Sequence, residues 1–220
     1  MSIFGSPRIL RAYAPLDFLG SPEAYVLCET DEKGVCCPLR EQDGSVTCHL
    51  MFVDALIEFG RARLLGRAVH VASAAVVDRD AFIDADGLGY KANVHLGWPA
   101  RDGALLTRPS GRLGSWHRTL HARAVDGLPA SFQVGQDCID EVHRIREVAG
   151  MFAWQETNAL TVQWPAAKME HIAERALATI NVVSANTLKP NQLALFDPEF
   201  ERWHFVPYAQ AHQRSWRGAN

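Results

Sequence analysis

Four cysteines and a histidine lie close together in the first quarter of the chain and could bind a metal ion. They are Cys28, Cys36, Cys37, Cys48 and His49. Thiolate and imidazole groups are the ligands that zinc prefers. The spacing lacks the C-x2-C pair that most structural zinc sites use, and adjacent cysteines in a strand point to opposite faces. Zinc is therefore the candidate cofactor, and burial of the cysteines as small apolar side chains is the alternative.

Aspartates form a second cluster, at Asp78, Asp80, Asp84 and Asp86. Their oxygens could bind a divalent cation, but position twelve counted from Asp84 is His95 rather than the glutamate of a calcium-binding loop. Asp84 or Asp86 with Lys91 would supply residue types found in nucleases. An Asp-Gly turn at Asp86 explains the cluster more simply, because both residue types favour turns.

Two other pairs of residues lack the geometry for catalysis. His117 and His121 lie in a segment with strand character, and no H-E-x-x-H glutamate accompanies them. Cys138 and His143 lie roughly 140° apart around the axis of an expected helix, so they do not face each other. The sequence contains no G-x-S-x-G, Walker or G-x-G-x-x-G motif. It therefore disfavours a conventional hydrolase, nucleotide-phosphate enzyme or dinucleotide enzyme, and leaves open whether the protein is an enzyme.

Arginines and aromatic residues are concentrated in residues 101–123, which contain five arginines and one aspartate. The candidate nucleic-acid-binding residues are Arg101, Arg108, Arg112, Trp116, Arg118 and Arg123. Proline and glycines between Arg108 and Trp116 favour a loop. Arginines on a loop can bind phosphates and a tryptophan can stack on a base, as in the binding of single-stranded nucleic acid. The alternative is an ordinary solvated loop.

A short segment near the C-terminus carries the most specific mark in the sequence. It reads Gln-Leu-Ala-Leu-Phe over residues 192–196, and prolines on either side favour an extended conformation. This segment resembles the pentapeptide by which bacterial replicative polymerases, Y-family polymerases and repair proteins dock on the sliding clamp. The resemblance implies clamp contacts by Gln192, Leu193, Leu195 and Phe196. It covers five of 220 residues, and packing of the apolar residues in the core is the alternative.

Three helices are expected to position these groups. Apolar residues at helical spacing predict helices over residues 49–65, 137–149 and 165–184. Gly66 and Gly150 would end the first two, because glycine favours the left-handed conformation that follows many helices. Pro165 would begin the third, since proline is tolerated in the first turn.

Strands are expected around these helices. Residues 68–77 indicate a buried strand, and residues 81–83 and 90–96 flank the Asp86-Gly87 turn as a hairpin. Weaker strand patterns lie at residues 23–28, 118–125, 158–164 and 200–206. Helices and strands do not alternate as β-α-β units. The sequence therefore predicts an α+β fold, with a mixed or mainly antiparallel sheet and about three helices packed on it.

The composition, with 48% hydrophobic and 21% charged residues, is typical of a globular protein. We expect one domain over residues 1–186 and a C-terminal segment, residues 187–220, with the docking motif and a final strand. No apolar run is long enough to cross a membrane, and no signal-peptide core is present. An odd number of cysteines then favours reduced thiols, so we expect a cytoplasmic protein without membrane contacts.

These observations lead to one expected function and two alternatives. We expect an accessory protein of DNA replication, repair, mobile-element or defence biology, which binds DNA or RNA through the arginine-rich loop and docks on the sliding clamp. One alternative is a small metal-dependent enzyme that uses the Cys/His or Asp cluster. The other is an RNA-binding subunit or a protein-interaction module without catalysis.

Overall fold

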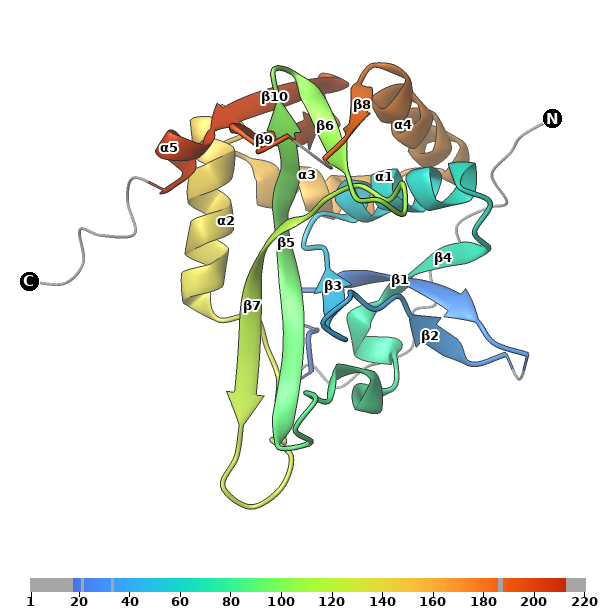
Figure 1. Ribbon diagram of the computed structural model, residues 1–220, viewed down its shortest axis with the longest axis vertical. Helices are drawn as coiled ribbons and strands as arrows, with labels where there is room; N and C mark the ends of the chain where they lie inside the picture. The colour runs from blue at the N-terminus through green and yellow to red at the C-terminus, as the bar shows by residue number, and fades with distance from the viewer. Residues whose placement is uncertain (1–17, 21, 33, 186–187, 213–220) are drawn as a thin grey trace, which may run out of the picture.

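The described residues fold into two β-sheets with helices packed around them (Figure 1). The computed structural model describes residues 18–20, 22–32, 34–185 and 188–212. The strands are β1 (Tyr25–Thr30), β2 (Cys36–Pro38), β3 (Val46–Cys48), β4 (Val69–Ser73), β5 (Gly89–Arg101), β6 (Ala104–Thr107), β7 (Trp116–Arg123), β8 (Asn181–Ser184), β9 (Gln192–Asp197) and β10 (Arg202–Pro207). The α-helices are α1 (Phe52–Leu64), α2 (Gln136–Val148), α3 (Trp154–Thr161), α4 (Ala166–Ala178) and α5 (Tyr208–His212). Two short 3₁₀ helices, Ala74–Val76 and Arg79–Phe82, follow β4.

The larger sheet is organised around β5, which changes partners along its length. Its first half lies between β3, which runs parallel to it, and the antiparallel β7. Its second half pairs with β6 and β9, and β8 and β10 extend the sheet at its two ends. The change occurs at Gly97, where φ is +153° and the register against β7 shifts. A Cβ atom here would lie 2.8 Å from the Cγ atom of Leu193, so glycine is needed for β9 to approach β5 this closely.

The smaller sheet has the order β2-β1-β4 and is antiparallel. Its central strand β1 is buried over its first four residues, whereas the edge strand β2 has three residues, none of them fully buried. A tight turn joins the two strands, in which the Gly34 N–H donates to the Asp31 carbonyl and Gly34 has a φ of +80°. Because β2 is short and lies at an edge, apolar burial contributes little to holding it in place.

Helix α1 lies at the centre of the packing between the two sheets. It contacts β1 and β4 of the small sheet and the helices α3 and α4. Nearly all of its residues are buried, and two of them, Asp54 and Glu58, are carboxylates one turn apart. Asp54 accepts a 2.7 Å hydrogen bond from Arg146 of α2 in a buried ion pair. The helix ends before Gly66, which has a φ of +78°, as the sequence predicts.

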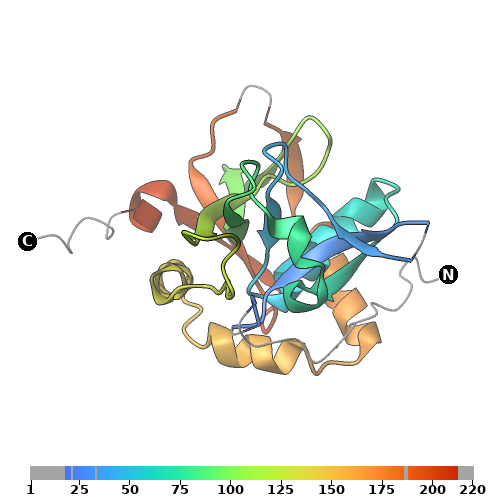
Figure 2. The same ribbon diagram turned by 90° about the horizontal axis from the view of Figure 1, so that it is seen from below.

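The other helices follow one another along the chain. Figure 2 views α2 end-on, with α3 and α4 continuing along the same side of the molecule. Asn158 of α3 ties this layer to α1, because its side-chain oxygen accepts a 2.7 Å hydrogen bond from the Phe52 N–H. This contact satisfies one of the free N–H groups at the start of α1, where no side chain of the helix itself acts as a cap.

The α+β fold class and the mainly antiparallel sheet are confirmed, as are the helices around residues 49–65 and 137–149. Two segments differ from the prediction. The expected strand at 158–164 is largely helix α3, in which the Thr161 hydroxyl donates to the Asn158 carbonyl. The expected helix at 165–184 ends at Ala178, because the β-branched Val182 and Val183 that follow pair with β6 as strand β8.

The expected hairpin around Asp86-Gly87 forms in part. Gly87 has a φ of +72°, and its N–H donates to the Asp84 carbonyl in the predicted turn. Residues 79–82, however, form a 3₁₀ helix, and a single antiparallel bridge joins Ile83 to Tyr90. The Asp78 side chain caps this 3₁₀ helix by accepting from the Asp80 N–H, which favours the helix over a strand.

The expected C-terminal segment contributes two strands to the large sheet. β9 pairs with β5 on one side and with β10 on the other. These strands therefore belong to the same core as residues that precede 187, while residues 187 and 213–220 lie outside the described part of the chain. No helix in the described residues is both long and apolar enough to span a membrane.

Candidate metal centre

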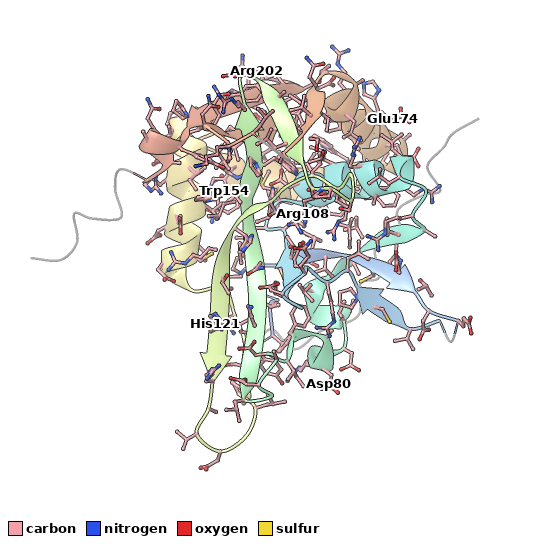
Figure 3. The ribbon with its side chains drawn as sticks, viewed as in Figure 1. Asp80, Arg108, His121, Trp154, Glu174 and Arg202 are labelled. Atoms are coloured by element: carbon pink, nitrogen blue, oxygen red, sulfur yellow. The ribbon has the colours of Figure 1, made fainter. Side chains whose placement is uncertain are left out.

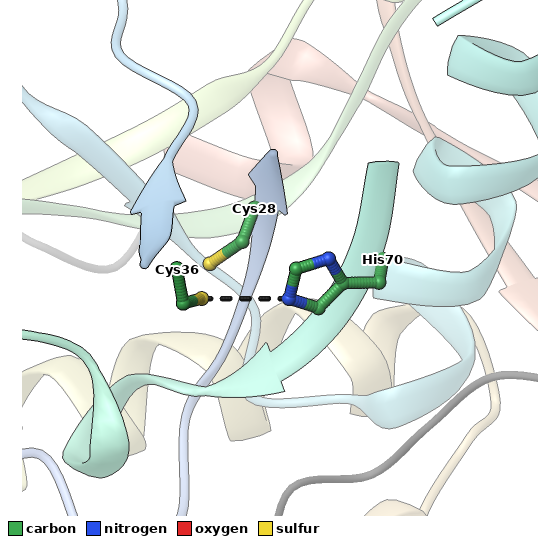
Figure 4. A group of neighbouring side chains, drawn as sticks. All are labelled: Cys28, Cys36 and His70. Atoms are coloured by element: carbon green, nitrogen blue, oxygen red, sulfur yellow. Dashed lines mark hydrogen bonds between the residues drawn. The ribbon is translucent and has the colours of Figure 1, made fainter. Parts of the chain in front are cut away.

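Strand pairing brings two cysteines and a histidine together on one face of the small sheet (Figure 4). Cys28 of β1 lies directly opposite His70 of β4. Cys36 of β2 lies opposite Thr30, two residues along β1 from Cys28. Because side chains alternate between the faces of a strand, the side chains of Cys28, His70 and Cys36 project from the same face.

The donor atoms of this cluster are close enough to share one metal ion. The sulfur atoms of Cys28 and Cys36 and a ring nitrogen of His70 all lie within 4.8 Å of one another. The Cys36 Sγ atom is 3.5 Å from the His70 Nε2 atom. Ligands of a tetrahedral zinc ion lie about 3.5–3.8 Å apart, given bond lengths of about 2.3 Å to sulfur and about 2.0 Å to nitrogen. Within the part of the chain that the structure describes, no other group of three Cys, His, Asp or Glu side chains is placed to hold a metal ion.

Burial and charge differ across the cluster. Cys28 is fully buried, while Cys36 and His70 are half-buried and face solvent in part. A hydrogen bond from the Cys28 thiol lowers the pKa of Cys36 to about 6, with burial opposing this shift and His70 supporting it. The same hydrogen bond raises the pKa of Cys28. Cys36 is therefore the more acidic of the two thiols.

The structure separates the other residues of the predicted zinc set from this cluster. Cys37 is exposed, because the residue after Cys36 in β2 points to the opposite face, as the sequence analysis anticipates for adjacent cysteines. Cys48 is fully buried as an apolar side chain, and burial raises its pKa to about 12. His49 is buried with its ring centroid 4.8 Å from that of His95. Only Cys28 and Cys36 of the five predicted residues come together.

His70 is the candidate ligand that the sequence alone does not reveal. It lies inside the buried strand predicted at residues 68–77. The sequence does not show that this strand pairs with β1, and only that pairing places the histidine opposite Cys28. One signal was available in the sequence. A polar residue flanked by Val69 and Val71 in an alternating strand must face away from the side that those valines bury.

The predicted nucleic-acid-binding residues contact different parts of the protein. In the view of Figure 3, Arg108 on the β6–β7 connection is drawn in front of the middle of the fold, whereas His121 lies toward the lower end of β7. Arg101 lies at the end of β5 and donates to the Lys189 carbonyl. The ring of Trp116 packs against that of Tyr208, with centroids 4.8 Å apart.

Each of the remaining arginines in the predicted set contacts carboxylates of the protein itself. Arg108 and Arg112 both bind Glu41, and Arg118 binds Asp137 and Glu141. Arg123 binds Asp84 and Asp86. These ion pairs neutralise much of the positive charge that phosphate binding would use. Nucleic-acid binding through this stretch stays a prediction, and the described contacts do not favour it.

The segment that resembles a clamp-docking peptide is strand β9. The side chains of Leu193, Leu195 and Phe196 are 0% exposed, and Phe196 packs edge-on against Trp203. Gln192 accepts a hydrogen bond from the Gly103 N–H at the end of the strand. Both edges of β9 are paired, so docking through these residues would require the strand to leave the sheet. The accessibility on which this prediction depends is therefore missing from the described fold, and clamp binding stays a prediction.

The other residue sets that the sequence offered also have structural partners. Asp86 accepts from the Leu88 N–H in the expected turn, and Lys91 donates to Asp43 rather than to Asp84 or Asp86. His117 and His121 lie on the exposed face of β7. Cys138 is buried, while His143 accepts from the Trp154 indole. None of these sets gathers donors in the way that the Cys28–Cys36–His70 cluster does.

Comparison of the chain with protein-family models, with curated proteins and with solved structures found no match. The geometry of the described residues is therefore the basis for a functional proposal.

Proposed function

We propose that this protein binds a zinc ion through Cys28, Cys36 and His70. One observation carries the proposal: three donors from three neighbouring strands lie within 4.8 Å of one another. Two sulfur donors and one imidazole suit zinc better than magnesium or calcium, which prefer oxygen. Cys28 and Cys36 are two of the five zinc ligands expected from the sequence, and His70 takes the place of the other three.

The position of the cluster suggests what the metal would do for the fold. β2 is a three-residue edge strand with little apolar burial, and its ligand Cys36 is joined to β1 by only a short ladder. A zinc ion would connect β2 to β1 and β4 through bonds that are stronger than this ladder. Binding to the folded state alone would stabilise it, because any ligand that prefers the folded chain raises the free energy of unfolding.

The cluster supplies three protein ligands, which leaves the fourth tetrahedral position to water. Zinc sites of this composition are open, in contrast to structural sites that are closed by four protein ligands. A zinc ion in such a site acidifies the bound water and can polarise a carbonyl or phosphoryl oxygen. The half-buried Cys36 and His70 place this position on the solvent side of the sheet.

Metal analysis of untagged protein tests the proposal directly. We expect an equimolar amount of zinc, and we expect Co²⁺ substitution to give the visible absorption of a tetrahedral thiolate site. Cys36→Ser and His70→Ala should each lose the metal. Cys37→Ser is the matched control for the first variant, since Cys37 is the exposed neighbour on the opposite face. His171→Ala is the control for the second, because its side chain is 65% exposed on α4.

Two outcomes would contradict the zinc site. One is protein that contains no metal and takes up none when zinc is supplied under reducing conditions. The other is loss of metal in Cys37→Ser but not in Cys36→Ser, which would place the metal elsewhere. Thiol titration in parallel would detect a Cys28–Cys36 disulfide, and such a bond in protein kept under reducing conditions would replace the metal centre by a redox pair.

A further inference from the structure

A second set of polar side chains lines a cavity where β1, β3, α1 and the β6–β7 connection meet. Its lining residues are Leu27, Leu39, Glu41, Thr47, His49, Glu58, Arg112, Leu113 and Ser115. We call this space the Glu58 cavity. The space in it that a water-sized group can occupy is about 20 Å³, so it admits one oxygen of a small head group whose remainder lies at the open mouth. The polar lining comes from three separate stretches of the chain, residues 41–49, Glu58 and residues 112–115, and of these residues only Arg112 and His49 are candidates from the sequence.

Positive charge exceeds negative charge at the mouth of the cavity. Glu41 is the carboxylate shared by two guanidinium groups, those of Arg108 and Arg112. The Thr47 hydroxyl donates a 2.9 Å hydrogen bond to the same carboxylate. The side chain of Glu41 is 7% exposed and that of Arg112 is 20% exposed, so this charge is poorly screened by water. One carboxylate between two cations leaves a net positive charge that an anion would complement.

Glu58 forms the inner wall and is the group whose charge state is most affected by its surroundings. It is buried, and its Oε1 atom accepts a 2.7 Å hydrogen bond from the Trp98 indole. Burial raises the pKa of Glu58 to about 7, and the Trp98 hydrogen bond and Arg112 oppose this rise. Among the described residues no protein group binds its other carboxyl oxygen. A protonated Glu58 can therefore donate a hydrogen bond into the cavity.

The remaining charged and titratable groups near Glu58 leave this donor available. Arg108 favours its ionised form and Glu41 opposes it. On its own helix, Asp54 is paired with Arg146 and directed to α2. His49 is 3% exposed and lines the cavity, and burial lowers its pKa to about 3, so it is neutral.

Neutral imidazole and hydroxyl groups complete the wall. The Nδ1 atom of His49 has no partner among the described residues. Behind it, His95 makes a 2.8 Å hydrogen bond to the hydroxyl of Ser115, which itself lines the cavity. Buried polar atoms without partners are costly and uncommon, and a bound polar ligand is one way in which they are satisfied.

We propose that the Glu58 cavity binds the oxyanion head group of a small ligand, a carboxylate or a phosphate ester, between Arg112 and Glu58. The guanidinium supplies the charge, and Ser115 and Glu58 supply hydrogen-bond donors. A protonated carboxyl group is required because an ionised Glu58 would repel the ligand. Binding is therefore linked to proton uptake, and the affinity falls as the pH rises. The site is separate from the proposed zinc centre, so either can exist without the other.

NMR titration of the full-length protein with acetate and with inorganic phosphate tests this site. The indole N–H of Trp98, assigned from a Trp98→Phe spectrum, reports on Glu58 because it donates to that carboxyl group. We expect a saturable shift of this resonance, with an affinity at least about tenfold higher at about pH 6 than at about pH 8. A response to acetate alone indicates a carboxylate ligand, and a response to phosphate alone indicates a phosphate ester.

Matched variants separate this site from weak surface binding. Arg112→Gln should weaken binding at least about tenfold, since a hydrogen bond to a charged group is lost. Arg118→Gln should leave it unchanged, because Arg118 binds Asp137 and Glu141 away from the cavity. If Arg112→Gln fails to fold, Ser115→Ala removes a donor from the wall without breaking an ion pair. A Trp98 resonance that stays fixed with both anions, or that shifts equally in Arg112→Gln, would overturn the proposal.

Discussion

Strand β9 and the Cys28–Cys36–His70 cluster differ in how the fold places the residues that could bind a partner or a metal ion. The first is a contiguous motif of five residues, and the fold buries all four of its apolar side chains completely in a strand that pairs with β5 and β10. The second is dispersed over more than forty positions of sequence, and the fold gathers it on one face of a small sheet. A motif that is continuous in sequence is thus buried in the core, while a set with no recognisable spacing forms a candidate site.

The difference shows what decides whether a residue is available for binding. In β9 the five consecutive residues from Leu193 to Asp197 are buried, so both faces of the strand are covered, and both backbone edges are paired, which leaves no face for a partner. In the small sheet the edge strand β2 leaves Cys36 half-buried, and the register of β1 against β4 fixes the position of His70. Strand pairing decides both whether a side chain is exposed and whether residues from separate segments come together. A linear sequence pattern does not contain this information.

Truncation of the β9 core should give the largest effect. Phe196→Ala removes a fully buried ring that packs on Trp203, and we expect a loss of about 3–5 kcal/mol in the free energy of unfolding. Chemical denaturation measures this loss. Phe200→Ala is the control, since that ring is 67% exposed in the following turn. Unchanged stability in Phe196→Ala would mean that β9 is not held in the sheet, and docking on a clamp would then become accessible.

Zinc should stabilise the small sheet by a comparable amount. At free zinc about 100-fold above the dissociation constant, we expect the free energy of unfolding to rise by about 3 kcal/mol. Cys36→Ser should lose this increment and Cys37→Ser should keep it, because only Cys36 faces His70. Thermal melts with zinc and with a chelator measure the increment. An increment of equal size in both variants would show that the gathered cluster is not the metal site.

The residues that line the Glu58 cavity are also dispersed in the sequence. Glu58 should make the free energy of unfolding depend on pH. The pKa of Glu58 is about 7 in the folded protein, against 4.5 in an ordinary glutamate. Between these values the folded chain holds a proton that the unfolded chain has released, so the free energy of unfolding falls as the pH rises. The Glu58→Gln variant lacks this pH-dependent loss of stability. Its free energy of unfolding relative to the wild-type protein should therefore increase by about 2 kcal/mol from about pH 5 to about pH 8.

Urea denaturation at several pH values measures this difference. His49, whose pKa burial lowers to about 3, gives a slope of the opposite sign, but it is present in both proteins and cancels in the comparison. Glu174→Gln on the exposed face of α4 is the control and should show no pH-dependent difference. A pH-independent difference for Glu58→Gln would mean that Glu58 is already ionised in the folded protein.

The smallest expected changes in the free energy of unfolding concern the arginines, where a cavity residue should differ from a surface residue. Arg112→Ala should cost about 1 kcal/mol, since it removes a partly buried partner of Glu41. Arg123→Ala should leave the unfolding transition unchanged, because that side chain is 55% exposed.

If the arginine-rich stretch binds nucleic acid, both variants should also weaken binding of a single-stranded oligonucleotide at low salt. Oligonucleotide binding by fluorescence anisotropy tests this prediction beside the stability measurements.

Several elements were predictable because their signals are local. Apolar spacing locates α1 and α2, and the Asp86-Gly87 pair locates its turn. The segment at residues 158–164 was not predictable in the same way. Its helix is held by Asn158, which binds both the start of α1 and the Leu50 carbonyl, so a tertiary contact outweighs its local preference. The candidate sites were predictable only in part: Cys28 and Cys36 by residue type, but not His70 or Glu58.

The residue types available for chemistry, the α+β class and the positions of the strongest helices can all be read from the linear sequence. Those properties depend on side-chain chemistry and on periodicity over a few residues, which are present in the linear chain. The tertiary structure alone decided which residues meet. Pairing of β1 with β4 placed Cys28 opposite His70, and packing of α1 against the sheets buried Glu58 beside Trp98. The tertiary structure also makes Gln192–Asp197 an interior strand of the large sheet, because Gly97 lets β9 lie closely against β5.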